Sequence, residues 1–216
     1  MQMCASAATV AFSGLEARPV EVQVQLAGGQ PGIVIVGLGD KAVSEARERV
    51  RAAFASIGLA IPAGRLIVNL APADLPKEGS HYDVPIALAM MAAIGALPRD
   101  ALDNVLCFGE LGLDGALAPA PGALPAAMAA HGLGHAFICP EACGQEAAWA
   151  GGEVIAAPTL LSLINHFRGG AALKPPERGD LISTEGVPDL RDVRGQEQAK
   201  RALEIAAAGS HNILLL

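Results

Sequence analysis

Leu70–Met90 reads LAPADLPKEGSHYDVPIALAM, and this stretch decides the fold. Arg65–Leu70, whose last residue begins this stretch, is typical of a buried strand. The residues from Asp83 onward are typical of a helix. The loop between them is polar and rich in turn residues, and it contains Asp74, Lys77, Glu78, Ser80, His81 and Asp83. Loops held between rigid elements often carry function, so this loop is the first candidate site.

Before the loop, the sequence predicts a hairpin, a further strand and a helix. Thr9–Leu15 and Val20–Leu26 are expected to pair around a turn at Glu16–Pro19, because the second run alternates apolar and polar residues. Gly32–Val36 is a continuous apolar run, which we expect to form a central strand. A helix of residues 41–57 should follow, capped by Asp40, with one apolar face made of Val43, Ala46, Val50, Phe54 and Ile57.

After the loop, strands and helices continue to alternate. The patterns predict helices at Asp83–Ile94, at Gly122–Ala130, from Pro140, and from a cap at Thr159 to about Phe167; they predict strands at Val105–Glu110, His135–Cys139 and Glu153–Ala156. This order favours an α/β or α+β domain over residues 1–168. Residues 169–188 have the Gly, Pro and charge content of a linker, and a new unit begins over residues 189–216 with a helix at Glu197–Ala208 and a strand at Ile213–Leu216.

Composition and charge limit the classes of protein. The chain has 216 residues, of which 52% are hydrophobic and 17% charged, as in a globular protein. Residues 1–168 hold nine Lys and Arg against 15 Asp and Glu, a balance of −6, which disfavours an autonomous nucleic-acid-binding module. No apolar run is long enough to span a bilayer, no signal peptide is evident, and Cys4, Cys107, Cys139 and Cys143 lack a disulfide framework. We therefore expect a cytoplasmic protein without a membrane partner.

In the loop, Lys77 and Ser80 suggest a Ser–Lys hydrolase, in which an amine activates a nearby hydroxyl. Nothing in the sequence shows how Lys77 would be desolvated to act as a base. The alternative is that Lys77, Glu78 and Asp83 are turn and cap residues, and the sequence favours this second interpretation.

Gly37, Gly39 and Ala42 match a loose dinucleotide-binding fingerprint between a strand and a helix. That fingerprint also needs an acidic residue at the end of the next strand, and residues 58–62 supply none. A tight strand-to-helix turn is the favoured interpretation.

His131, His135, Cys139 and Cys143 recur every four residues, as zinc ligands on one helix would. Gly132 and Gly134 interrupt such a helix, so the sequence favours Cys139 as a small buried side chain instead. Arg47, Arg49 and Arg51 form a basic strip, which Glu45 and Glu48 dilute; a solvated helix face is the simpler interpretation, and a nucleic-acid contact is the alternative.

Four segments together resemble the ComM/YifB family of magnesium-chelatase-like AAA+ ATPases. They are GLGDKAVSEARERVRAA, NLAPADLPKEGSHYDVPIALAMM, GELGLDGAL and VRGQEQAKRALEIAAAGSHNILLL. The resemblance implies that residues 1–168 are similar to the Lon protease domain, a ribosomal-protein-like α/β fold, and that residues 189–216 begin an AAA+ module.

The resemblance to Lon allows a test by residue. Where Lon has P-K-D-G-P-S-A-G, this chain has Pro76–Asp83, and the nucleophile's position falls on His81. The position of the Lon catalytic lysine falls on Leu124. Both halves of the catalytic dyad are therefore absent, and we expect no catalytic residues in this chain. An active peptidase that uses Ser80 remains the alternative.

The AAA+ resemblance implies that Val193, Arg194, Gly195 and Gln196 line the adenine of ATP. The strand at Ile213–Leu216 should lead into a phosphate-binding loop, but no G-x-x-x-x-G-K-[ST] motif occurs in the 216 residues. We expect ATP and magnesium to be cofactors of a full-length protein, and no activity from this chain alone.

The resemblance also implies a function for the full-length protein. It would be a hexameric ring that uses ATP for helicase or branch-migration work on DNA in natural transformation. The 1–168 domain would be a platform for binding or assembly, with the 74–83 loop and the Lys41–Arg51 helix as contact surfaces. The alternative within the family is a magnesium-chelatase-like motor that remodels a protein.

Overall fold

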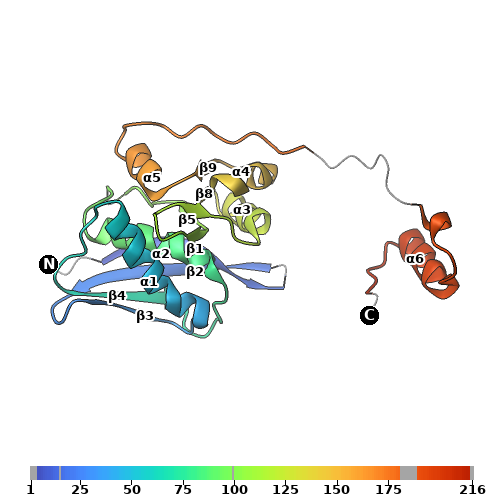
Figure 1. Ribbon diagram of the computed structural model, residues 1–216, viewed down its shortest axis with the longest axis horizontal. Helices are drawn as coiled ribbons and strands as arrows, with labels where there is room; N and C mark the ends of the chain where they lie inside the picture. The colour runs from blue at the N-terminus through green and yellow to red at the C-terminus, as the bar shows by residue number, and fades with distance from the viewer. Residues whose placement is uncertain (1–3, 15, 99, 181–188, 215–216) are drawn as a thin grey trace. The chain divides into compact units, whose positions relative to one another are not determined.

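A computed structural model describes residues 4–14, 16–98, 100–180 and 189–214. Contacts divide the chain into two units, residues 1–179 and 180–216, and each is described by itself. The first unit contains a seven-stranded sheet in the order β3-β4-β2-β1-β5-β8-β9 (Figure 1). Its strands are β1 Cys4–Ser13, β2 Glu16–Ala27, β3 Gly32–Val36, β4 Arg65–Ala71, β5 Val105–Cys107, β8 Ala136–Pro140 and β9 Val154–Ala157.

The sheet is mixed and mostly parallel. β2 runs antiparallel to both β1 and β4, whereas the β3–β4, β1–β5, β5–β8 and β8–β9 pairs are parallel. A second, two-stranded sheet joins β6 Glu110–Leu111 to β7 Leu117–Ala118. The α/β fold class is therefore confirmed; the more specific likeness to the Lon domain stays a prediction.

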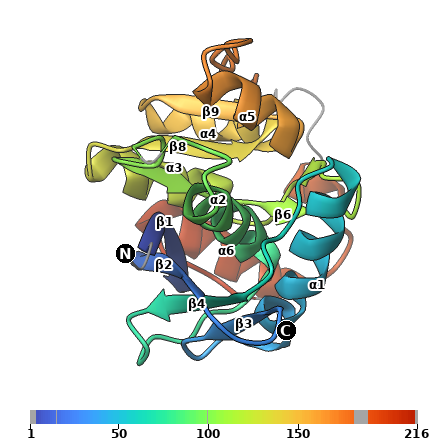
Figure 2. The ribbon, with the colours of Figure 1, turned by 90° about the vertical axis from the view of Figure 1, so that its left-hand side faces the viewer.

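Helices cover the two faces of this sheet unequally. α1 Lys41–Ser56, α2 Asp83–Ala93 and α5 Leu160–Phe167 contribute to one apolar core, and α3 Ala123–Gly132 and α4 Glu141–Ala147 contribute to the other. Every residue of α2 is buried, so this helix lies at the centre of the larger core (Figure 2). The polar side of β2 and β4 carries Gln23 and Asn69, whose side chains bond to each other.

The decisive stretch forms the elements that the sequence predicts. β4 ends at Ala71, a short 3₁₀ turn occupies Ser80–Tyr82, and α2 begins at Asp83 with Pro85 in its first turn. The predicted cap of α1 is also confirmed, because the Asp40 carboxylate accepts a hydrogen bond of 2.9 Å from the Val43 N–H. Thr159 caps α5 in the same way.

Three predictions about strands are wrong. Glu16–Pro19 is not a turn: β2 begins at Glu16, which pairs with Ser13, and Pro19 pairs with Val10 inside the hairpin. β3 is an edge strand rather than a central one. Val105–Glu110 is not one strand, because the chain turns at Gly109, whose φ is 137°. The Gly109 N–H donates to the His81 carbonyl, and its C=O accepts from the Val84 N–H.

Residues 171–179, part of the predicted linker, form a strap on the first unit. The Gly179 N–H donates to the Gln145 carbonyl at 3.2 Å, and the indole N–H of Trp149 donates to the Gly179 carbonyl at 3.1 Å. Residues 181–188 of the predicted linker lie outside the described residues.

The second unit contains a 3₁₀ turn at Leu190–Asp192 and helix α6 at Glu197–Gly209. α6 confirms the predicted helix. A strand was predicted at Ile213–Leu216, but Ile213 and Leu214 have no regular structure. The last two residues of that prediction lie outside the described part of the chain.

Candidate functional site

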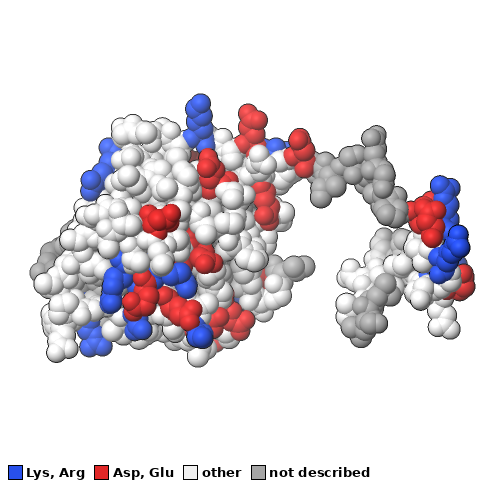
Figure 3. Space-filling view, in the orientation of Figure 1, with Lys and Arg blue, Asp and Glu red and all other residues white. Residues whose placement is uncertain are grey.

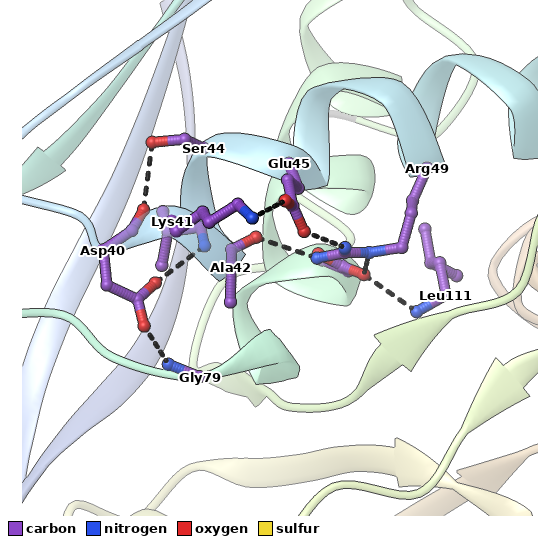
Figure 4. Close-up of polar contacts among 10 residues, drawn as sticks. Asp40, Lys41, Ala42, Ser44, Glu45, Arg49, Gly79 and Leu111 are labelled. Carbon is purple, nitrogen blue, oxygen red and sulfur yellow. Dashed lines mark hydrogen bonds and ion pairs between the residues drawn. The ribbon is translucent and has the colours of Figure 1, made fainter.

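The loop of residues 71–82 lies against the turn that joins β3 to α1. The Asp40 N–H donates to the Lys77 carbonyl at 3.0 Å, and the Lys77 N–H donates to the Leu38 carbonyl at 3.2 Å. Asp40 binds both segments, because one carboxylate oxygen caps α1 and the other accepts from the Gly79 N–H at 3.2 Å (Figure 4). The loop is therefore held at Lys77 by backbone pairing and at Gly79 by the shared Asp40 carboxylate.

A buried ion pair joins α1 to the start of α2. The Arg49 guanidinium donates to both carboxylate oxygens of Asp83, at 2.6 and 2.9 Å, and to the Ala42 carbonyl at 2.9 Å (Figure 4). Asp83 has no solvent exposure, and it also accepts from the Leu111 N–H at 3.1 Å. Burial raises the pKa of the Asp83 carboxyl, and the bonds from Arg49 and Leu111 oppose that rise.

These two residues differ from their predicted roles. Arg49 does not belong to a solvated strip, and Asp83 does more than occupy the first turn of a helix. The sequence contained a signal that could have found the pair: Arg49 lies three residues after Ala46 and one before Val50, at the border of the buried face of α1. The partner across 34 positions could not be read from that spacing.

Lys77 is completely buried, although it lies in the turn-rich loop where the sequence predicted a turn or cap residue. Its ammonium nitrogen donates to the carbonyl of Pro72 within the same loop. Burial lowers the pKa of Lys77, and Asp74 partly opposes this. Among the described residues no hydrogen bond joins Lys77 to Ser80, which lies half-buried at the start of the 3₁₀ turn. The lysine is thus held within its own loop.

His81 is 4% exposed and lies in an aromatic cluster. Its Nε2 lies 2.9 Å from the Val10 carbonyl, which can only accept, so the ring is the Nε2–H tautomer. The ring stacks on Phe108 at 4.9 Å between centroids and lies beside Phe12 and Tyr82. Burial lowers the pKa of His81, which keeps the ring neutral. The histidine at the Lon nucleophile's position serves to pack β1 against the loop.

Leu124 lies in the first turn of α3, half-buried, and its N–H donates to the Glu146 carboxylate at 3.2 Å. The position of the Lon lysine therefore carries an aliphatic side chain whose backbone ties α3 to α4. The Leu124 side chain has no ionisable group, and the His81 ring is bonded to Val10.

The glycines of the dinucleotide-like motif have a packing role. A Cβ on Gly37 would collide with the Leu70 carbonyl, and a Cβ on Gly39 would lie 2.6 Å from the Val43 side chain. Ala42 is half-buried in the first turn of α1, and its carbonyl accepts from Arg49. These contacts favour the strand-to-helix turn over a cofactor site.

The four residues of the zinc hypothesis do not share a helix. His131 is in α3, His135 precedes β8, Cys139 is in β8 and Cys143 is in α4. Cys139 has no exposure, and burial raises its pKa to about 12, so it is a buried thiol as the sequence favours. Within the described ranges, no group of three or more His, Cys, Asp or Glu side chains could hold a metal ion.

Charges on α1 are mixed rather than basic. Arg47 and Arg51 are about half exposed, and Glu48 lies 3.0 and 3.5 Å from them. Figure 3 shows blue and red side chains interspersed on the face that α1 presents. In the second unit, Val193, Arg194, Gly195 and Gln196 are exposed, and the backbone is left-handed at Gly195 and Gln196. No described helix has both the length and the apolar character needed to cross a bilayer.

Comparison with known proteins identifies the family. A family model described as subunit ChlI of Mg-chelatase matches residues 20–143, and another described as magnesium chelatase, subunit ChlI, matches residues 189–216. The first match covers more than half of the chain, and the chain belongs to the magnesium-chelatase-like family of ComM and YifB.

Two relatives show how far the similarity extends. The protein YifB of Escherichia coli is 44% identical over 209 residues, which are 96% of this chain and 41% of YifB. The competence protein ComM of Haemophilus influenzae is 39% identical over 214 residues, which are 95% of this chain and 42% of ComM. The chain thus spans about two fifths of the length of the curated relatives that it matches.

Proposed function

We propose that this chain is the amino-terminal region of a ComM/YifB-type AAA+ motor that uses ATP to unwind or branch-migrate DNA. The support is the similarity to a competence protein over 95% of the chain together with the chelatase-family match at residues 189–216. In this proposal the full-length protein works as a hexameric ring, and its first unit binds or assembles without catalysis.

One structural observation carries the non-catalytic role of the first unit. The reactive side chains of the 71–82 loop already have partners within the fold: Lys77 bonds to Pro72, and His81 bonds to Val10. Both side chains are buried, so a substrate carbonyl would have to displace these contacts to meet them. A loop whose reactive side chains are bonded within the fold suits a scaffold that presents a surface for binding or assembly.

In this proposal the adenine of ATP binds to the second unit. Val193 is 42% exposed and offers an apolar surface on which an adenine ring can pack, beside Arg194, Gly195 and Gln196. The 216 residues contain no G-x-x-x-x-G-K-[ST] motif, so this proposal assigns the phosphates and the magnesium ion to other residues of the full-length protein.

A strand-exchange assay tests the motor. The full-length protein is mixed with ATP and a four-way DNA junction that carries one labelled strand, and the products are separated by size. The proposal predicts ATP-dependent release of labelled duplex. If junctions persist while a magnesium-chelatase-like protein partner stimulates ATP hydrolysis, the protein-remodelling alternative replaces the DNA motor.

The peptidase alternative has its own test. The protein is incubated with casein and with a serine-directed fluorophosphonate probe, next to the Ser80→Ala variant. We expect neither cleavage nor labelling above the level of the variant. Labelling that disappears in Ser80→Ala would establish an active Ser80 and reject the scaffold role.

A further inference from the structure

β3 has one backbone edge without a partner. The Gly32 N–H donates to the Gly64 carbonyl, and the register pairs Gly32 with Arg65, so Gly32, Val34 and Val36 direct their N–H and C=O groups to β4. The N–H and C=O groups of Ile33 and Ile35 therefore point away from the sheet. In the described part of the chain neither residue makes a backbone hydrogen bond on that side.

This edge lacks the features that usually prevent pairing with another chain. Gly32–Val36 contains no charge and no proline. Val36 at its end is 45% exposed, and Leu38 shortly after it is 60% exposed. Along β3, Ile33 is 3% exposed, Ile35 is half-buried and Val36 is exposed, so the accessible part of this edge lies toward its end, whereas all four residues of β9 are buried. An apolar open edge is a template for an added strand.

A pocket of about 730 Å³ opens at the beginning of the same edge. It lies between β3, the end of α1 and the segment of residues 58–63, and its wall includes Ile33, Ala55, Leu59 and Ile61. Arg51 is the charged residue of its lining, and this side chain is half exposed. Glu48 occupies one side of the guanidinium at 3.5 Å, which leaves other N–H groups free to bind an anion.

We propose that the β3 edge binds an extended segment of a partner protein, which adds a strand next to Ile33–Ile35. The segment places an aliphatic side chain in the pocket and an acidic side chain on Arg51. The free N–H and C=O groups select a polypeptide backbone, the apolar wall selects the aliphatic residue, and Arg51 selects the acid.

A nucleic acid fits this surface less well. The donors and acceptors of Ile33 and Ile35 alternate along a strand, which matches a peptide and not a phosphodiester chain. The wall of the pocket is mostly apolar, and Glu48 would repel phosphates beside Arg51. Single-stranded DNA therefore serves as the competing ligand in the test.

The probe is a phage-displayed library of random linear peptides, selected against the immobilised chain. We expect enrichment of peptides that alternate β-branched residues and carry Asp or Glu next to the aliphatic position. A synthetic fluorescent copy of an enriched peptide then gives affinities by anisotropy. The proposal is overturned if no sequence pattern is enriched. It is also overturned if single-stranded DNA displaces the peptide and Arg47→Glu weakens peptide binding as much as Arg51→Glu does.

Matched variants separate the two kinds of contact. Arg51→Glu should weaken the peptide about tenfold, whereas Arg47→Glu, one turn earlier and paired to the same Glu48, should stay within about twofold. Ile35→Pro removes an N–H that faces away from β4 and should abolish binding, while Ile35→Val retains that N–H and should bind. Equal binding by all four variants contradicts the assigned surface.

Hydrogen exchange gives a readout that needs no variant. In the free chain the amide of Ile35, which is half-buried and faces away from β4, should exchange faster than that of Val34, which is bonded to β4. Added peptide should slow exchange at Ile33 and Ile35 and leave Val34 unchanged. If peptide protects other strands but not these two amides, the edge is not the binding site.

Discussion

Asp83 begins the central helix and has no contact with solvent. Its carboxylate is held by two hydrogen bonds from Arg49 and one from the Leu111 backbone. A buried ion pair adds little net stability compared with an apolar pair of the same shape, but the loss of one partner leaves a charge without compensation. At the scale of residues, this pair rather than Ser80 is the critical feature of the loop.

Replacement of Arg49 by Leu should therefore lower the free energy of unfolding by about 3 kcal/mol, since Asp83 stays buried without its cation. Urea unfolding followed by circular dichroism measures the change. Arg47→Leu is the matched control on the same helix, and because Arg47 is half exposed we expect a loss below about 0.5 kcal/mol. Equal losses in the two variants would show that the pair has no special role.

His81 should make stability depend on pH. Burial lowers the pKa of the folded state, so the unfolded chain binds a proton that the native chain does not. The stabilisation is complete above the ordinary pKa of about 6.5 and is lost as pH falls below it, at up to ~1.4 kcal/mol per pH unit.

The comparison variant is His81→Gln, which keeps a side-chain N–H and cannot titrate. Its unfolding free energy, measured by urea titration from pH 7.5 to 5, should fall less steeply than that of the starting chain. Parallel slopes would mean that His81 is not the titrating group.

The sequence reveals the type of these residues but not their partners. A polar cluster in a loop was evident from Asp74 to Asp83, and the cap at Asp40 was predicted correctly from its position before an apolar helical pattern. The burial of Lys77 and the pairing of Arg49 with Asp83 depend on how β3, α1 and the loop meet in space. The spacing of residues within one element does not show which distant segments contact each other.

At the scale of elements, the helices were easier to predict than the places of the strands. α1 and α5 follow helical periodicity behind side-chain caps at Asp40 and Thr159, and α2 is uniformly apolar after Asp83 with Pro85 in its first turn. β3 was expected at the centre because an apolar run suits a strand buried on both sides. It lies at the edge of the sheet and pairs with β4, and its apolar run has the same sequence pattern as a central strand.

The strap of residues 171–179 shows a second element that composition alone misplaces. Its prolines, charges and single glycine suggest a free linker, yet Trp149 bonds to Gly179 and the Arg178 guanidinium lies 5.4 Å from the centre of the Trp149 ring. The backbone N–H of Leu173 also donates to His166 at 3.1 Å. These contacts hold the strap to α4 and α5.

Trp149→Ala should release the strap, so that the backbone around the exposed Arg178 fits more readily into the active site of trypsin. If the free energy of releasing the strap falls by roughly 1 kcal/mol, cleavage after Arg178 should be about fivefold faster. Cleavage after the exposed Arg191 of the second unit is the internal reference, and mass spectrometry of the products measures both sites. An unchanged ratio of the two cleavage rates would show that Trp149 does not hold the strap.

At the scale of the whole molecule, fold class and family were accessible from sequence, whereas the order of the strands was not. The sheet order places β1 beside β5 and β2 beside β4, pairs that are separated by long stretches of chain. Such pairs are chosen by shared packing on α2, which contacts β1, β2 and β5. The resemblance to magnesium-chelatase-like proteins was confirmed by the family matches at residues 20–143 and 189–216.

ATP hydrolysis by the full-length protein, measured with increasing amounts of branched DNA, tests the proposed function most directly. The same titration is run with Ser80→Ala, a variant in the loop that we regard as a scaffold. The proposal predicts that DNA stimulates hydrolysis several-fold and equally in both proteins. Hydrolysis that does not respond to DNA, or a response that Ser80→Ala abolishes, would contradict a DNA motor with a non-catalytic first unit.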